Sequence, residues 1–221
     1  MLESIEIMAS TTVTIKKADP TALGIFSYGF SLLILSIYAM GFYPWSESIV
    51  MIAPALVFGG VFLLVAANWE YNNGNTFGAT AFGTYSAFFL TFAVAHIGIV
   101  AGWFSSLEVA HLIGLLAVAF AVMTFFYWMG SFKMNLALNL TLLFLLITFI
   151  LYAIPLTSLS SSMTSLMGKI PDALKPAGYV GFVDSLFTMW VGAAVVINDR
   201  WELAGLKGPI PTYPLTKRKS K

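Results

Sequence analysis

Six apolar runs of about twenty residues, each free of Lys and Arg, constrain this chain more than any other feature of its sequence. A bilayer core about 30 Å thick is crossed by roughly 20 apolar residues of helix. Composition agrees, because 59% of the residues are hydrophobic and only 10% are charged, too few to cover a water-soluble domain. We therefore expect an all-α integral membrane protein with six transmembrane helices, over residues 22–42, 49–67, 78–104, 109–130, 135–155 and 178–197.

The distribution of positive charge predicts the orientation of these spans. An even number of spans places both tails on one side, with the connections after the second and fourth spans. Nine of the eleven cations fall there, which are Lys16, Lys17, Lys133, Arg200, Lys207, Lys217, Arg218, Lys219 and Lys221. Cytoplasmic loops carry such an excess, so we expect both termini in the cytoplasm and the protein in the cell membrane.

The chain divides accordingly into two tails and one membrane domain. Residues 1–21 form a cytoplasmic N-terminal tail without the apolar stretch of a signal peptide. Residues 22–204 form the six-helix domain, and residues 205–221 form a cytoplasmic C-terminal tail whose prolines predict an extended conformation. The Ser/Thr-rich segment 156–177 is predicted to be the longest outer loop, folded over the outer mouth.

Composition and motifs exclude several functional classes. The chain has no Cys and a net charge of +1, which excludes thiolate chemistry and gives no basic surface for nucleic acid. It contains no phosphate-binding glycine loop, no His-Glu-x-x-His pair and no Gly-x-Ser-x-Gly elbow. We expect no enzymatic activity, no cofactor and no metal.

Polar residues within the spans are informative, because each needs a hydrogen-bond partner in the bundle or a wet cavity. The third span places small and hydroxyl side chains on one helical face. Such a stripe lines a path or lets helices pack closely, and the stripe alone favours packing. The fifth and sixth spans carry similar faces through Asn139 and Thr188. The stripe consists of Thr80, Thr84, Ala87, Thr91 and Ala95.

Three titratable residues are candidates for proton coupling. Asp184 is the one acidic residue well inside a predicted span, and no span contains a cation to pair with it. Its structural and proton-coupling roles stay open. His96 and His111 lie toward the outer side, with Glu108 one turn before His111. They suggest a pH-responsive mouth or a weak metal site, although interhelical hydrogen bonding is the more common role for such residues.

Residues 69–85 contain three short pieces in a fixed order, which are Glu70-Tyr71, then Gly74-Asn75-Thr76-Phe77-Gly78, then Thr80-Ala81-Phe82. With these pieces, the stretch resembles the acetate uptake transporter family, which includes bacterial succinate-acetate permeases and fungal acetate permeases. Before the first span, the family signature Asn-Pro-Ala-Pro-Leu-Gly-Leu compares with Asp19-Pro20-Thr21-Ala22-Leu23-Gly24-Ile25. Of these positions, Pro20, Leu23 and Gly24 match the signature.

The resemblance implies a homo-hexamer of six-span protomers, each with its own pore narrowed midway by three bulky residues. Those positions correspond here to Tyr28, Tyr85 and Leu145. Tyr28 replaces a family Phe and adds a hydroxyl able to bond a carboxylate. The resemblance therefore predicts passage of acetate and related small carboxylates, with succinate among them, by proton-coupled symport or as an anion channel.

Hydrogen-bond donors are expected to replace the hydration of the carboxylate along this path. The start of the third span offers unpaired backbone N–H groups, although ordinary capping by Asn75 or Thr76 explains the same residues. The predicted substrate-binding set is Asn75, Thr76, Thr80, Thr84, Asn139 and Thr188. A non-transporting membrane scaffold and an intramembrane enzyme are the alternatives.

Overall fold

The computed structural model describes residues 18–158 and 170–215, which are helical apart from turns, an extended C-terminal segment and one isolated β-bridge between Asn135 and Pro214. Five single helices are long and apolar enough to cross a membrane, and a composite segment, Ile49–Asn72, makes the sixth. The single helices are α2 (Thr21–Ala39), α5 (Thr76–Val100), α6 (Ser106–Ser131), α7 (Leu136–Thr157) and α8 (Ile170–Leu203). The prediction of six spans is confirmed, and the chain is a multi-pass membrane protein.

Helix ends follow local sequence signals. The Asn75 and Asn135 side chains cap α5 and α7 by accepting from the backbone N–H groups of Gly78 and Leu138, at 3.1 and 2.9 Å. Ser105 and Glu108 form a reciprocal capping box that starts α6. Glycines in the left-handed region, where a side chain is strained, follow α2, α4, α5 and α8. They are Gly41, Gly74, Gly102 and Gly205.

The second span is irregular along its length. It runs through η1 (Trp45–Met51), α3 (Ile52–Pro54), the π-helical η2 (Ala55–Phe62) and α4 (Leu63–Asn72). Pro54 lacks an N–H, which favours a change of hydrogen-bond register at this point. Side chains of neighbouring helices use the carbonyls of this span: Ser31 donates to Pro54 O at 3.2 Å, and Ser86 donates to Gly60 O at 2.8 Å.

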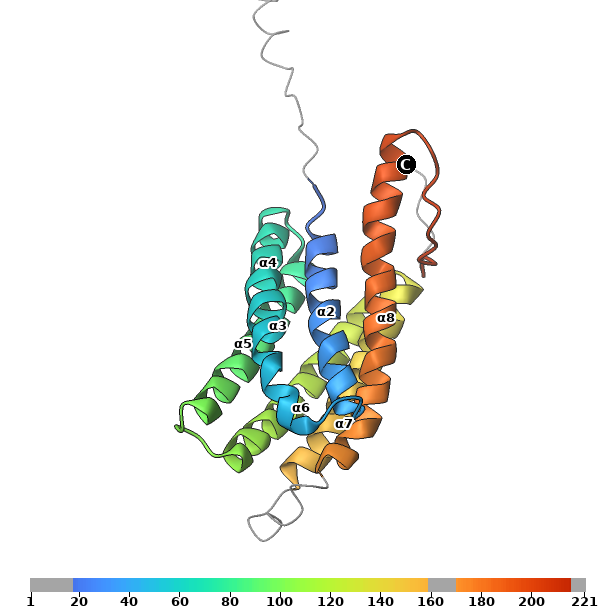
Figure 1. The fold of residues 1–221 in the computed structure, drawn as a ribbon. Helices are drawn as coiled ribbons and strands as arrows, with labels where there is room; N and C mark the ends of the chain where they lie inside the picture. The colour runs from blue at the N-terminus through green and yellow to red at the C-terminus, as the bar shows by residue number, and fades with distance from the viewer. Residues whose placement is uncertain (1–17, 159–169, 216–221) are drawn as a thin grey trace, which may run out of the picture.

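The helices pack as a bundle in which α8 contacts α2 and α7, α7 contacts α6, and α4 contacts α5. Small residues allow close approach. A Cβ on Gly178 of α8 would lie 2.6 Å from the backbone N of Met40, and a Cβ on Gly114 of α6 would lie 2.9 Å from the carbonyl carbon of Leu156. The α4–α5 and α6–α7 connections lie at the end of the bundle where α2 begins and α8 ends (Figure 1).

The prediction of a long loop over 156–177 is wrong at both ends. Helix α7 continues to Thr157, past Pro155, and α8 already begins at Ile170. Pro171 lies in the first turn of α8, where a missing N–H costs nothing because the turn has no partner for it. In the same region, the Lys175 ammonium forms an ion pair with the Asp172 carboxylate, with Nζ 2.6 Å from Oδ1. Residues 159–169 lie outside the described part.

Helix α8 extends beyond its neighbours, and the following segment folds back along it (Figure 1). Asn198 exchanges two hydrogen bonds with the backbone of Ile210, at 2.8 and 3.0 Å. The Trp190 indole N–H donates to Pro211 O at 3.0 Å, and Leu136 N–H donates to Tyr213 O at 2.9 Å. The segment up to Leu215 is extended, as expected, but it is tied to α7 and α8.

The charge asymmetry is described only in part. Lys133 and Arg200 lie at the bundle end that holds the described chain ends, whereas Lys175 lies at the opposite end. Lys16, Lys17, Lys169 and residues 217–221 lie outside the described residues. The cytoplasmic placement of the termini therefore stays a prediction.

Candidate functional site

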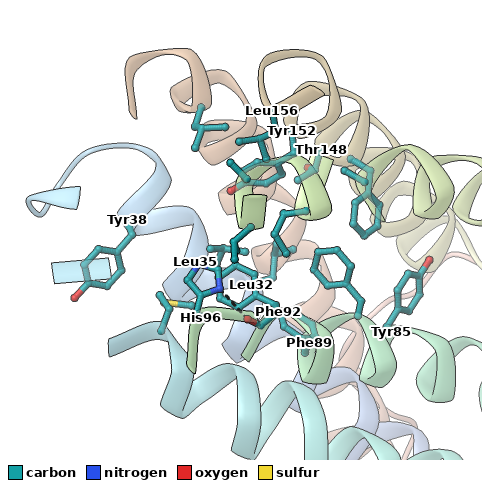
Figure 2. A pocket seen from close by; sticks show the side chains of 18 of the residues that line it. Leu32, Leu35, Tyr38, Tyr85, Phe89, Phe92, His96, Thr148, Tyr152 and Leu156 are labelled. Carbon is teal, nitrogen blue, oxygen red and sulfur yellow. Dashed lines mark hydrogen bonds between the residues drawn. The ribbon is translucent and has the colours of Figure 1, made fainter. Parts of the chain in front are cut away.

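A cavity of about 310 Å³ lies inside the bundle. Its volume is at the lower end of the roughly 300–1,000 Å³ typical of small-molecule sites. The wall includes Ile99 near the end of α5, Ser106 at the start of α6 and Leu174 near the start of α8. The cavity therefore occupies the half of the bundle opposite the described chain ends. Figure 2 shows side chains of α2, α5 and α7 converging on it.

The wall is mainly aromatic and aliphatic. Helix α5 contributes Phe88, Phe89 and Phe92, and α2 contributes Leu32 and Leu35. The aromatic rings are in mutual contact, with ring centroids of Phe88 and Phe89 5.6 Å apart in an edge-to-face arrangement. Such a wall offers a solute few hydrogen bonds and favours compact molecules with an apolar part.

Tyr28, Tyr85 and Leu145, which we call the waist, line the deep end of the cavity. They come from near the middle of α2, α5 and α7, and their side chains are 7%, 5% and 2% exposed. The ring centroids of Tyr28 and Tyr85 are 5.6 Å apart. The structure thus brings together three residues that are 57 and 60 positions apart in the sequence.

The two waist hydroxyls bind other protein groups. The Tyr28 hydroxyl donates to Asp184 Oδ2 at 3.0 Å, and the Tyr85 hydroxyl is 3.0 Å from Thr124 Oγ1. Figure 2 shows the Tyr85 hydroxyl pointing away from the other labelled side chains. The waist therefore presents ring surface to the cavity, and in this conformation the Tyr28 hydroxyl is occupied by Asp184.

Asp184 is fully buried on α8 and is bonded by hydroxyl groups. Besides Tyr28, the Thr188 hydroxyl donates to Asp184 Oδ1 at 3.4 Å. A carboxylate within a bundle needs such donors, because its burial costs several kcal/mol otherwise. The sequence left the partner of Asp184 open, and the structure assigns it to one of the waist residues.

The stripe predicted on the third span does not line the cavity. Thr80 and Ala87 are exposed, and the α5 side chains on the cavity wall belong to another face. The hydroxyls of Thr80, Thr84 and Thr91 each donate to the carbonyl four residues earlier, at 2.8 Å. Periodicity identifies a face of a helix but does not say which neighbour that face meets.

The six predicted substrate-binding residues lie outside the cavity wall. Asn75 and Asn139 make side-chain bonds at the bundle end opposite the cavity, where Asn139 Nδ2 donates to Ser131 Oγ at 2.8 Å. Thr84 Oγ1 is 3.2 Å from the Tyr127 hydroxyl, and Thr188 holds Asp184. Thr76 is exposed, as is Thr80.

His96 and His111 are placed differently with respect to the cavity. His96 is part of the wall, with Nδ1 2.8 Å from Phe92 O and its ring stacked on Phe92 at 4.0 Å. His111 is half-buried on α6, and the Glu108 carboxylate is engaged with Ser105 in the capping box. Among the described residues, no three His, Cys, Asp or Glu side chains gather as a metal ion would require.

Comparison with known proteins decides the family. The family model described as GPR1/FUN34/yaaH matches residues 3–208. The chain belongs to the GPR1/FUN34/yaaH family. The resemblance seen in residues 69–85 is thereby confirmed, and named relatives include transporters of acetate.

Two relatives and one solved structure illustrate the similarity of this GPR1/FUN34/yaaH member. The succinate-acetate/proton symporter SatP of Escherichia coli K12 is 24% identical over 186 residues, which cover 84% of this chain and 92% of SatP. Acetate permease A of Emericella nidulans is 27% identical over 83% of this chain and 63% of the permease. The structure of the bacterial acetate channel SatP matches with a TM-score of 0.77 at 23% identity, covering 89% of this chain and 99% of that chain.

Sequence reasoning missed one buried carboxylate, in the family stretch itself. Glu70 is 2% exposed at the end of α4. Its Oε1 accepts from the Thr21 hydroxyl at 2.6 Å, and its Oε2 accepts from Asn75 Nδ2 at 2.8 Å. Glu70 thus joins the starts of α2 and α5. The available signal was its place in the Glu-Tyr piece of that stretch.

Proposed function

We propose that this protein transports acetate and related small carboxylates, with succinate among the candidates, across the cell membrane through a path within each protomer. One observation carries the proposal: a largely apolar cavity of about 310 Å³ ends at a buried waist formed by three different helices. Membership in a family with acetate-transporting relatives supports the choice of substrate.

The physical problem that such a path solves is the charge of the solute. A carboxylic acid with a pKa of about 4.3 is more than about 99% ionised at neutral pH. An anion loses its hydration in hydrocarbon and is therefore excluded from the bilayer core. Within the bundle, hydroxyl, amide and backbone N–H donors replace water, and the waist selects against solutes that are bulky or strongly hydrated.

The path begins in the cavity and continues past the waist toward the end where α2 begins. We assign the cavity to the outer side and both termini to the cytoplasm, on the charge distribution of the whole sequence. Beyond the waist, the donors expected from the sequence are exposed or bonded to other protein groups in this conformation, so a passing carboxylate must replace those partners. They are Asn75, Thr76, Thr80, Thr84, Asn139 and Thr188. By similarity to the family, six protomers assemble as a homo-hexamer with one path each.

Two modes of transport are distinguishable by experiment. In proton-coupled symport, Asp184, His96, His111 or the substrate itself carries the proton. An anion channel needs no proton carrier. Uptake of labelled acetate into proteoliposomes separates them. Symport predicts that, under an imposed inward proton gradient, the acetate concentration inside the vesicles rises above the concentration outside. A channel predicts an acetate flux that follows the membrane voltage.

The same assay tests transport itself. Protein-free liposomes provide the baseline for diffusion of the protonated acid, and vesicles that contain the purified protein must exceed this baseline. Uptake that ignores the acetate gradient, the proton gradient and the voltage would overturn the proposal. A competition series of unlabelled carboxylates of increasing size then ranks the substrates.

A further inference from the structure

We infer that Asp184 is a positioning residue of the waist: its carboxylate holds the Tyr28 ring across the path through the Tyr28 hydroxyl and so limits the size of the solutes that pass. The inference rests on the proposed transport function. It assigns to Asp184 the role of a hydrogen-bond acceptor, which differs from the role of a proton carrier.

The geometry fixes Tyr28 from two sides. On one side its ring meets α5, with ring centroids 5.6 Å from Tyr85 and 6.2 Å from Phe89. On the other side its hydroxyl reaches α8 and donates to Asp184 Oδ2 at 3.0 Å. The hydrogen bond is more directional than the ring contacts, so it is the contact that defines where the end of the ring lies.

The carboxylate itself is held in place. Thr188, one turn later on α8, donates to the other carboxylate oxygen at 3.4 Å. Asp184 and Thr188 are 0% and 2% exposed, so both are enclosed by protein. An acceptor that is fixed in this way positions its donor more firmly than a mobile surface group does.

Packing of α2 against α8 does not by itself call for this carboxylate. A Cβ on Gly29 of α2 would lie 3.2 Å from both Thr188 and Met189, and a Cβ on Gly178 of α8 would lie 2.6 Å from Met40 N. Small residues thus already bring the two helices into close contact. A buried carboxylate is a costly way to join two helices, which points to a use at the waist, where its partner Tyr28 lies.

Two substitutions at one position test the acceptor role. Asp184→Asn keeps an oxygen that accepts from Tyr28 but has no proton to exchange, whereas Asp184→Leu has a similar size and no acceptor. The measurement is the ratio of labelled butyrate uptake to labelled acetate uptake in proteoliposomes. Asp184→Leu is expected to raise this ratio about fivefold or more. A fivefold rise means that the barrier for butyrate falls by about 1 kcal/mol relative to the barrier for acetate. Asp184→Asn is expected to keep the ratio within about twofold of wild type.

A control variant at Ser185 and a double variant with Tyr28→Phe complete the experiment. Ser185→Ala removes a buried hydroxyl that donates to Phe182 O of its own helix, at 2.6 Å, and is expected to leave the ratio unchanged. In a Tyr28→Phe background, Asp184→Leu is expected to add nothing to the ratio. Equal uptake ratios for Asp184→Leu and wild type would overturn the inference. It would also be overturned if Asp184→Asn raised the ratio as much as Asp184→Leu does.

The hydrogen bond is also measurable without transport. The Tm in detergent of wild type, Tyr28→Phe, Asp184→Leu and the double variant gives a mutant cycle. The shifts are expected to be non-additive, with the double variant less destabilised than the sum of the single variants. Additive shifts would overturn the pairing. Absence of uptake by the wild-type protein would refute the transport proposal alone, while the cycle would still test the pair.

Discussion

The two halves of the bundle on either side of the waist differ in what the helices enclose. Toward the α5–α6 connection, the bundle encloses a cavity with a mainly apolar wall. Toward the described chain ends, side chains bond each other between helices, as Glu70 does with Thr21 and Asn139 with Ser131. One half provides room for a solute, and the other half holds the helices in register.

The comparison is tested most strongly at the waist that separates the halves. Tyr85→Ala removes the ring that contacts Tyr28, so butyrate is expected to pass more readily. The ratio of butyrate to acetate uptake should rise about tenfold, which corresponds to about 1.4 kcal/mol on the barrier. Thr91→Ala is the control, because this side chain lies on the same helix but not on the cavity wall. A non-transporting scaffold would show no acetate uptake in the wild type, and Tyr85→Ala would change only its assembly. That pair of results would contradict the role of the waist in transport.

The bonded half is tested by Glu70. Glu70→Ala leaves the Thr21 hydroxyl and the Asn75 amide without their acceptor, which should cost about 1–3 kcal/mol of the free energy of unfolding. The readout is Tm in detergent. Glu47→Ala removes an exposed carboxylate from η1 and should change Tm little. If both variants unfolded at the same temperature, the bonded half would not depend on Glu70.

Two tyrosine hydroxyls provide the finest comparison between the halves. Tyr85→Phe breaks the bond with Thr124 and should cost about 0.5–1.5 kcal/mol. Tyr152→Phe removes a buried hydroxyl that has no partner in residues 18–158 and 170–215, and it should be neutral or slightly stabilising. Thermal unfolding of the two variants under one condition measures the difference. A larger loss for Tyr152→Phe than for Tyr85→Phe would show that the Tyr152 hydroxyl has a partner after all.

Features that depend on nearby residues were predictable from the sequence. Hydropathy located all six spans, because the thickness of the bilayer sets their length. Asn75 was recognisable as a cap from its place before an apolar run. The exception among local features was the start of α8, where the Ser- and Thr-rich composition before Ile170 suggested a loop.

Features that depend on how the helices face each other were not predictable. The bond between Tyr28 and Asp184 joins residues 156 positions apart, and no local pattern reports such a distance. The resemblance placed Tyr28, Tyr85 and Leu145 at one level, but it did not show where their hydroxyls point. The stripe from Thr80 to Ala95 was a real periodicity on a face that does not meet the cavity.

The central claim is that acetate passes the waist, and the absence of Cys from the chain allows a direct test. Leu145→Cys introduces a single thiol at the waist, which a small methanethiosulfonate reagent converts to a mixed disulfide that mass spectrometry verifies. Ala87→Cys, on the exposed face of α5, is the matched control. Passage through the waist predicts that modification of Leu145→Cys lowers the initial rate of labelled acetate uptake about tenfold or more, about 1.4 kcal/mol of barrier, and that reduction restores it. Uptake at the original rate by fully modified Leu145→Cys protein would contradict passage at this point.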